Sequence, residues 1–181
     1  MSQANQGVAF LRGINVGGHR VTGPELAAVF VAAGCRDVST FLASGNVIFT
    51  CDFAITRDLA VRFESVLGTA LGYEVPVILR TGVEVQELAV QMPFDDDALG
   101  SSQGKPQIIL LRDEPSVAAT TEVVAMGNQN DLLFVEGVNV FWLPSAGVLK
   151  SDLDLVAVER LIGPTTMRTK NTIDRIAKKY L

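Results

Sequence analysis

The chain has 181 residues, of which 48% are hydrophobic and 19% are charged, and its formal net charge is −5. A chain of this length can remove roughly 70% of its unfolded surface from water, so a hydrophobic core is expected. The acidic balance argues against an extended nucleic-acid surface, although a local basic pocket remains open. No apolar run approaches the roughly 18 residues of a membrane span, and residues 1–6 lack the basic and apolar parts of a secretion signal. We therefore expect a cytoplasmic protein with no membrane contact.

Metal and disulfide chemistry have few candidate residues. The two cysteines, Cys35 and Cys51, are too few and too far apart for a zinc set or a disulfide framework, and we expect free, reduced thiols. The single histidine, His19, has no cysteine or carboxylate close to it in sequence, which favours a solvated loop residue. We expect no metal and no cofactor.

The first 80 residues predict one ferredoxin-like unit. Residues 7–11 are apolar on both faces, which indicates a central strand. Thr22 and Glu25 have the spacing of a capping box that opens a helix, and Gly34 suits its end. Further along, the pattern predicts a hairpin, a second helix and a closing strand at 37–42, 46–50, about 56–72 and 74–80. This strand and helix order is the split βαβ order, βαββαβ.

A connector and a polar passage follow. Thr81 and Glu84 form another capping-box spacing, which predicts a helix through Met92 that Pro93 ends. Residues 95–104 are polar and contain glycine, so we place the boundary there, between halves 1–95 and 105–181. Three aspartates, 95–97, raise the alternative of a divalent cation. Neighbours in sequence do not converge on one ion without a defined turn, so a solvated loop is expected.

The pattern then returns in the second half. We expect a strand, a helix, a hairpin and a helix at 107–112, 116–126, 131–143 and 151–162. Leu11 with Arg12 and Leu111 with Arg112 close the first strand of each half, which indicates an internal duplication. The second half has no clear last strand, and the chain ends in a helix with one apolar face, formed by Ile173, Ile176, Ala177 and Tyr180. The predicted fold is α+β, with two tandem ferredoxin-like halves and a C-terminal helix.

Two polar corners of the first half are predicted to meet. In a βαββαβ unit the first and third strands are antiparallel neighbours, so the end of the first lies beside the start of the third. This places Arg12 and Asn15 near Ser44 and Asn46. A guanidinium, two amides, a hydroxyl and loop backbone N–H groups suit an anionic oxygen of phosphate or carboxylate. The alternatives are that the glycines only shape a tight turn and that residues 44–46 only shape a hairpin.

Several segments resemble one family. Residues 11–18 (Leu-Arg-Gly-Ile-Asn-Val-Gly-Gly), residues 44–49 (Ser-Gly-Asn-Val-Ile-Phe), Arg168, and Asn171 with the following threonine closely resemble the bacterial domain-of-unknown-function family DUF1697. The resemblance covers nearly the whole chain and implies a duplicated ferredoxin-like α+β architecture, without an established activity. The family's C-terminal signature usually reads Thr-x-Arg-Asn-Trp-Asn-Thr, whereas Thr169 and Lys170 replace the Asn and Trp here.

The resemblance adds Arg168 and Asn171 to the candidate ligand-binding residues. The alternative for this segment is a helix start capped by Thr169 or Asn171, with Arg168 as a surface charge. The replacement of the tryptophan leaves open any stacking role that the family's aromatic has.

Three classes of function remain open at this point. The leading hypothesis is a small cytoplasmic protein that binds an anionic ligand, with catalysis undecided because no Ser-His-Asp set, reactive cysteine with a base or carboxylate pair can be assembled. The second is a single-stranded nucleic-acid-binding module, since ferredoxin-like sheets can present aromatic rings to bases. The rings available for stacking also suit a core, and they are Phe10, Phe41, Phe49 and Trp142. The third is a homodimeric protein-interaction domain.

Overall fold

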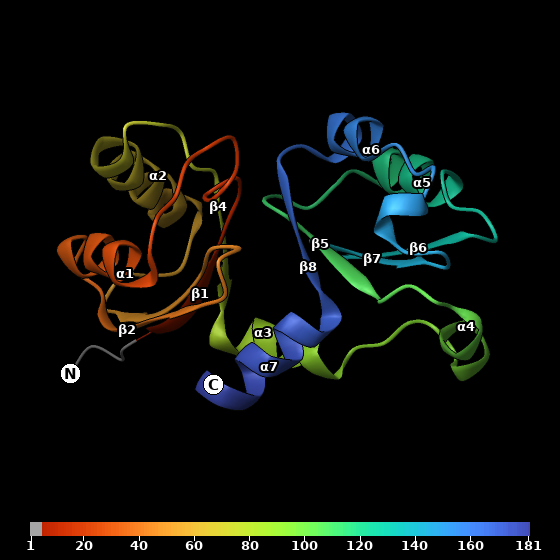
Figure 1. Cartoon of the computed structure of the whole chain (residues 1–181), viewed down its shortest axis with the longest axis horizontal. Helices are drawn as coiled ribbons and strands as arrows, with labels where there is room; N and C mark the ends of the chain where they lie inside the picture. The colour runs from red at the N-terminus through yellow and green to blue at the C-terminus, as the bar shows by residue number, and fades with distance from the viewer. Residues whose placement is uncertain (1–4) are drawn as a thin grey trace. The chain divides into compact units, whose positions relative to one another are not determined.

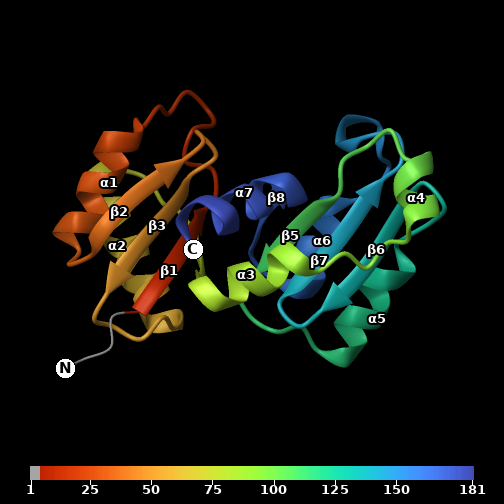
Figure 2. The ribbon, with the colours of Figure 1, turned by 90° about the horizontal axis from the view of Figure 1, so that it is seen from below.

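The computed structural model describes residues 5–181, which form eight strands, seven α-helices and one 3-10 helix (Figure 1). Contacts divide the chain into two compact units, Met1–Glu87 with Ile176–Leu181, and Leu88–Arg175. Each unit contains one four-stranded antiparallel sheet with two helices on one face (Figures 1 and 2). The predicted α+β architecture is thereby confirmed. No helix in the described part of the chain is both long and apolar enough to cross a membrane.

The first unit has the strand order β2-β3-β1-β4, the order of a ferredoxin-like sheet. Its strands are β1 (Asn5–Leu11), β2 (Arg36–Phe41), β3 (Asn46–Cys51) and β4 (Val77–Thr81). Its helices are α1 (Gly23–Ala32), α2 (Arg57–Leu71) and the first part of α3 (Gly82–Val90). The predicted capping box opens α1, since Thr22 and Glu25 bond to each other's backbone N–H groups, and Gly72 ends α2 in a left-handed conformation.

The core of the first unit explains why residues 7–11 of β1 are apolar. β1 lies between β3 and β4, so both of its edges are paired and it is the central strand that the sequence predicts. Ala9 and Leu11 face α1 and α2 together with Val47 and Phe49 of β3. The alternate residues are also buried, which leaves Val8 and Phe10 fully inaccessible. A strand buried on both faces has no position for a polar side chain.

The second unit repeats this arrangement with the strand order β6-β7-β5-β8. Its strands are β5 (Gln107–Leu111), β6 (Asp131–Glu136), β7 (Asn139–Pro144) and β8 (Thr165–Thr169). Its helical segments are α4 (Asp96–Ser101), α5 (Val117–Ala125), η1 (Val148–Lys150), α6 (Leu155–Ile162) and most of α7 (Lys170–Tyr180). Trp142 and Val140 of β7 pack with Ile109 and Leu111 of β5 in the core between this sheet and its helices.

The second half does have a closing strand, contrary to the prediction. β8 pairs along its whole length with β5, from Gln107 opposite Thr169 to Leu111 opposite Thr165. Its sequence, Thr-Thr-Met-Arg-Thr, has no apolar run because its two buried residues, Thr166 and Arg168, are polar, and each is 6% exposed. A strand whose buried residues are polar gives no hydrophobic alternation to detect.

Two helix boundaries and one loop also differ from the prediction. α6 begins at Leu155, because the Asp154 carboxylate caps it by accepting from the Val156 and Ala157 N–H groups at 3.0 and 2.9 Å. α3 ends at Val90, two residues before the expected end. The polar passage contains the short helix α4, whose Ala98 N–H donates to the Asp95 carboxylate at 2.8 Å.

The internal duplication extends to individual strand positions. Val8 of β1 lies opposite Arg80 of β4, and Ile108 of β5 lies opposite Arg168 of β8. Each arginine is buried, and its Nη1 donates to the carbonyl of the residue before it, at 2.9 Å for Arg80 and 2.8 Å for Arg168. Burial lowers the pKa of each guanidinium to about 10, so both stay charged at neutral pH.

Candidate functional site

The two polar corners of the first unit lie side by side, as the topology predicts. Phe10 is opposite Asn46 in the antiparallel register, and the Leu11 N–H donates to the Gly45 carbonyl at 2.8 Å. We call residues 12–20 the glycine loop and residues 42–45 the hairpin turn. The end of β1 therefore delivers the glycine loop directly beside the turn that joins β2 to β3.

Asn15 ties these two segments together. Its Nδ2 donates to the Ala43 carbonyl of the hairpin turn at 2.8 Å, and its Oδ1 accepts from the Val21 N–H at 2.7 Å. One side chain thus joins the beginning of the glycine loop, its exit toward α1 and the hairpin turn. Asn15 therefore organises the corner through backbone groups, and its amide is largely used within the protein.

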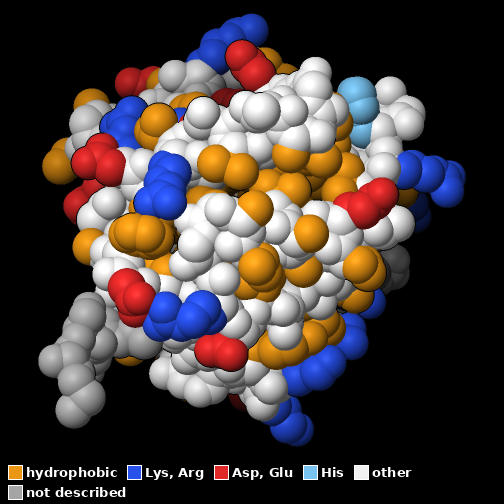
Figure 3. All heavy atoms as spheres, turned by 90° about the vertical axis from the view of Figure 1, so that its left-hand side faces the viewer, with side chains coloured by type: hydrophobic (Ala, Val, Ile, Leu, Met, Phe, Trp, Pro, Cys, Tyr) orange, Lys and Arg blue, Asp and Glu red, His pale blue; other side chains and the backbone are white. Residues whose placement is uncertain are grey.

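The glycine loop is also anchored from the other side by Tyr73, a residue that sequence reasoning did not select. Tyr73 Oη donates to the Ile14 carbonyl at 2.8 Å, and the Ile14 side chain is buried. The His19 ring stacks on Tyr73 with 3.8 Å between ring centroids and 24° between ring planes. His19 is exposed, as predicted, and the histidine side chain is visible on the surface in Figure 3. Nothing in the local sequence of His19 indicates this partner.

The hairpin turn depends on Asn46 and Gly45. Asn46 is completely buried, and its Nδ2 donates to the Phe41 carbonyl at 2.7 Å and to Ser44 Oγ at 3.1 Å. Gly45 has φ +76°, and a Cβ there would lie 2.7 Å from Ile14 Cγ2. The turn therefore packs against the glycine loop only with glycine at position 45. Ser44 is the exposed member of this group.

The exposed part of the corner is the tip of the glycine loop. Gly17 and Gly18 have φ +63° and +90°, and a Cβ at either position would meet nothing within 4 Å. Arg12 is half-buried at the base of the loop, and Arg20 is exposed near its end. A loop with left-handed residues beside a guanidinium presents backbone N–H groups and positive charge, which together suit an anionic oxygen.

A hollow of about 250 Å³ lies between the glycine loop, the start of α1 and the hairpin turn. Its lining includes Asn15 and Thr22. The start of α1 is already occupied by its own carboxylate, because Glu25 Oε2 accepts from the Thr22 N–H at 2.8 Å. This bond lowers the pKa of Glu25, so the carboxylate is charged at neutral pH. An anion would be repelled from the helix end and is better placed at the loop tip.

Arg168 and Asn171 belong to the second unit. Arg168 lies on β8, where its Nη1 donates to Thr166 Oγ1 at 2.9 Å, while Asn171 is exposed at the start of α7. Thr169 caps this helix, since its Oγ1 accepts from the Thr172 N–H at 3.2 Å. The helix-start interpretation of this segment is therefore confirmed, whereas Arg168 is a buried residue and not a surface charge.

Lys170, which replaces the tryptophan of the family signature, is also buried. Its Nζ donates to the Ala89 carbonyl at 2.7 Å and forms an ion pair with Asp174. Both partners lie in the second unit. Lys170 thus serves a structural contact within that unit.

Side chains that could ligate a metal are not clustered in the described part of the chain. No group of three or more His, Cys, Asp or Glu side chains there could hold an ion. Asp95, the first of the three consecutive aspartates, caps α4 through its carboxylate.

The four rings that a nucleic-acid surface would need are buried. Phe10 and Phe49 are 0% exposed, Trp142 is 1% and Phe41 is 8% exposed. Phe49 and Trp142 pack in the cores of the first and second units, and Phe41 meets the edge of the Tyr180 ring at a centroid distance of 6.0 Å. The interpretation of these rings as core residues is confirmed.

These features define a tandem ferredoxin-like α+β protein with one elaborated polar corner. A family model described as "Protein of unknown function (DUF1697)" matches residues 4–141, and the chain belongs to this family. The match ends before the 166–172 segment, so that signature lies outside it.

One solved structure is similar along almost the whole chain. The structure of the conserved bacterial protein SP0830 from Streptococcus pneumoniae covers 97% of this chain and 98% of its own, with a TM-score of 0.73 and 18% sequence identity. At this identity the likeness shows the fold alone. The search of curated proteins found no match.

Proposed function

We propose that the protein binds a small anionic ligand, bearing phosphate or carboxylate, at the corner formed by the glycine loop and the hairpin turn. The observation that carries the proposal is the pair of 2.8 Å bonds, Leu11 N–H to Gly45 O and Asn15 Nδ2 to Ala43 O, which hold the two segments together. A preformed arrangement of donors binds an anion without a large ordering cost.

Each candidate residue has a distinct role in this proposal. Arg12 supplies the charge-assisted bond, and the Ser44 hydroxyl and the backbone N–H groups of Gly17 and Gly18 supply neutral donors. Asn15 and the buried Asn46 position these donors and do not touch the ligand. This division follows from where each amide already donates.

Arg168 and Asn171 remain candidate ligand residues of the second unit, with different roles. The exposed amide of Asn171 is accessible to a ligand. Arg168 is 6% exposed, so its contribution is positive charge beneath the surface.

Titration calorimetry with inorganic phosphate, followed by nucleoside phosphates and small carboxylates, tests the proposal. We expect Arg12→Ala to weaken binding at least tenfold, since a charge-assisted bond contributes roughly 1.5–3 kcal/mol. Lys178→Ala, at an exposed position of α7, is the charge-matched control and is expected to leave the affinity unchanged. Binding that survives Arg12→Ala at full strength, or no binding to any probe, contradicts the site.

The alternatives are distinguished by separate measurements. A nucleic-acid module predicts salt-sensitive binding of mixed-sequence oligonucleotides at micromolar protein, and the burial of the four rings argues against it. A homodimeric interaction domain predicts a concentration-dependent sedimentation coefficient. We place the protein in the cytoplasm, which cell fractionation tests.

A further inference from the structure

The two cysteines lie opposite each other at the open end of the β2–β3 hairpin. Arg36 pairs with Thr50 in the antiparallel register, so the residue before Arg36, Cys35, faces the residue after Thr50, Cys51. Both side chains belong to the same core cluster on the helix side of the sheet, and they are 3% and 0% exposed. Because the two cysteines are distant in the sequence, no local pattern indicates that they lie close together.

This placement is close to what a disulfide needs. Opposite residues on one face of an antiparallel pair have Cβ atoms about 4.5–5.5 Å apart. A disulfide requires Cβ atoms about 3.5–4.5 Å apart. A small movement of one strand end is therefore sufficient. In the reduced protein both thiols are free.

We propose that Cys35 and Cys51 form a redox pair that closes into an intramolecular disulfide when the protein meets a low-molecular-weight disulfide such as oxidised glutathione. One cysteine thiolate attacks a sulfur of the oxidant, forming a mixed disulfide and releasing one reduced thiol. The second cysteine thiolate then attacks the protein-side sulfur, forming the Cys35–Cys51 bond and releasing the second thiol. The protein loses two protons and two electrons, and one oxidant molecule becomes two thiols.

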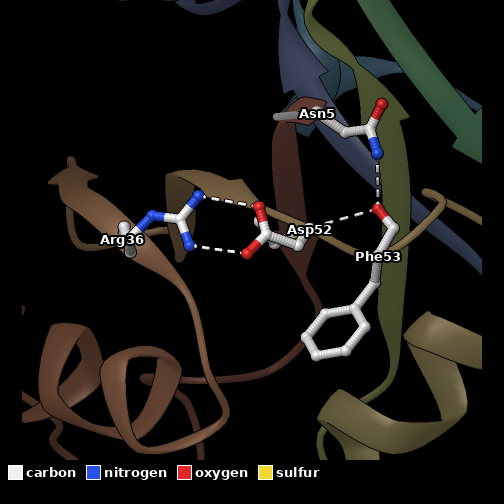
Figure 4. Close-up of polar contacts among 5 residues, drawn as sticks. Asn5, Arg36, Asp52 and Phe53 are labelled. Carbon is white, nitrogen blue, oxygen red and sulfur yellow. Dashed lines mark hydrogen bonds and ion pairs between the residues drawn. The ribbon is translucent and has the colours of Figure 1, made fainter. Parts of the chain in front are cut away.

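Phe53 lies beside both cysteines in the reduced state. Its ring lies 3.5 Å from where a Cβ on Gly34 would be, next to Cys35, and the Arg62 guanidinium lies over this ring at 4.4 Å. The Phe53 carbonyl accepts from Cys51 Sγ at 3.4 Å and from Asn5 Nδ2 at 2.8 Å. Figure 4 shows Asn5 reaching this carbonyl while the Phe53 ring points away from it. Oxidation therefore requires the Phe53 segment to move.

The open end of the β2–β3 hairpin can separate locally. β2 is an edge strand that pairs only with β3 in this sheet, and its register shifts between Arg36 and Ser39. On the exposed side, Arg36 holds Asp52 through two bonds of 2.8 Å each (Figure 4). Exposed ion pairs contribute little to stability, and edge segments open at low free-energy cost. An opening of this kind admits the oxidant.

Before the end of the hairpin opens, the two buried thiols react slowly with an oxidant. Burial, and then the neighbouring Cys51 sulfur, raises the pKa of Cys35 to about 11, and burial also raises the pKa of Cys51. The nucleophilic thiolate is therefore scarce at neutral pH until the end of the hairpin opens. The pair stays reduced in a reducing compartment and responds only to sustained oxidant.

Closure of the disulfide would fasten the open end of the hairpin whose other end carries Ser44 and Gly45. A cross-link between Cys35 and Cys51 restricts the unfolded chain, which raises the melting temperature of the folded protein. The oxidised protein thus holds the hairpin turn on a more rigid support. The cysteine pair does not require an anionic ligand at the corner.

Incubation of the reduced full-length chain with oxidised glutathione, followed by intact mass and non-reducing peptide mapping, tests the pair. We expect the loss of two hydrogen atoms, a Cys35–Cys51 cross-linked peptide and a melting temperature that rises and returns with dithiothreitol. Two glutathione adducts on one chain, a disulfide-linked dimer, or two unreacted thiols where the urea-unfolded chain reacts would each overturn the proposal.

Variants test the two cysteines and Phe53 separately. Cys35→Ser and Cys51→Ser should each give at most one glutathione adduct and no cross-link. Phe53→Ala should accelerate cross-linking several-fold, whereas Phe134→Ala, an exposed ring of β6, should leave the rate unchanged. Equal rates for Phe53→Ala and the unmodified chain would overturn the role of Phe53 in limiting access to the cysteines. The measurement on the unmodified chain keeps the proposal testable if a cysteine variant does not fold.

Discussion

In each unit the first strand ends beside a hairpin turn. These two corners share a backbone hydrogen bond, but their side chains differ. The Leu11 N–H donates to Gly45 O at 2.8 Å, and the Leu111 N–H donates to Val138 O at 2.9 Å. After this shared bond the first unit continues with the nine-residue glycine loop, whereas the second continues with Arg112-Asp113-Glu114-Pro115 and enters α5. The backbone hydrogen bond comes from the shared fold. The glycines and neutral polar residues after the first strand distinguish the first corner from the second. Acidic residues beside Arg112 make the second corner a poor anion site.

The largest expected effect lies in the cores, where Phe49 and Trp142 occupy equivalent positions opposite Gly7 and Gln107. Phe49→Ala should reduce the free energy of unfolding by about 3–5 kcal/mol. Trp142→Ala should cost about 1–3 kcal/mol more, because Trp142 Nε1 donates to the buried Asp131 carboxylate at 2.8 Å and its loss leaves a desolvated acceptor short of a donor. Urea unfolding monitored by circular dichroism measures both. Equal losses would show that the Trp142–Asp131 bond adds nothing.

A smaller effect distinguishes the two hairpin turns. Gly45→Ala should cost about 1–3 kcal/mol, since the new Cβ meets Ile14 and the positive φ is unfavourable for alanine. Val138→Ala, at the equivalent position, removes only part of a half-buried side chain and should cost less than about 1.5 kcal/mol. The same unfolding measurement compares them. If Val138→Ala is the more damaging change, the close contact between turn and glycine loop is not a stabilising feature of the first unit.

The smallest expected effect on the free energy of unfolding concerns the N-terminal caps of α1 and α5. Glu25 completes a capping box at α1, whereas Ser116 caps α5 with Ala119 at the position equivalent to Glu25. The bond to the Thr22 backbone lowers the pKa of Glu25 below its ordinary 4.5, so its stabilisation is present above that value. This stabilisation is lost as the pH falls through the lowered pKa.

The measurement for the caps is the pH dependence of unfolding. The difference between the unmodified chain and Glu25→Ala should shrink toward acid pH, while Ser116→Ala should cost about 1 kcal/mol at every pH. A Glu25→Ala difference that stays constant below pH 4.5 would contradict the role of the carboxylate.

The strand and helix order followed from hydrophobic periodicity and capping residues, because most elements bury apolar side chains at regular spacing. β8 escaped this reasoning, since Thr166 and Arg168 fill its buried positions and their burial depends on tertiary packing. The adjacency of the two polar corners could be predicted from topology. The bonds of Asn15 to Ala43 and of Tyr73 to Ile14 could not, because the partners lie 28 and 59 residues apart and no local signal connects them.

The most direct test of the difference between the corners is a phosphate titration followed by ¹H–¹⁵N correlation NMR of the full chain. We predict saturable shifts at the amides of Gly17, Gly18 and Ser44, and none at the amides of Asp113 and Gly137 at the second corner. Shifts that appear equally at both corners, or only at the second, would contradict the account.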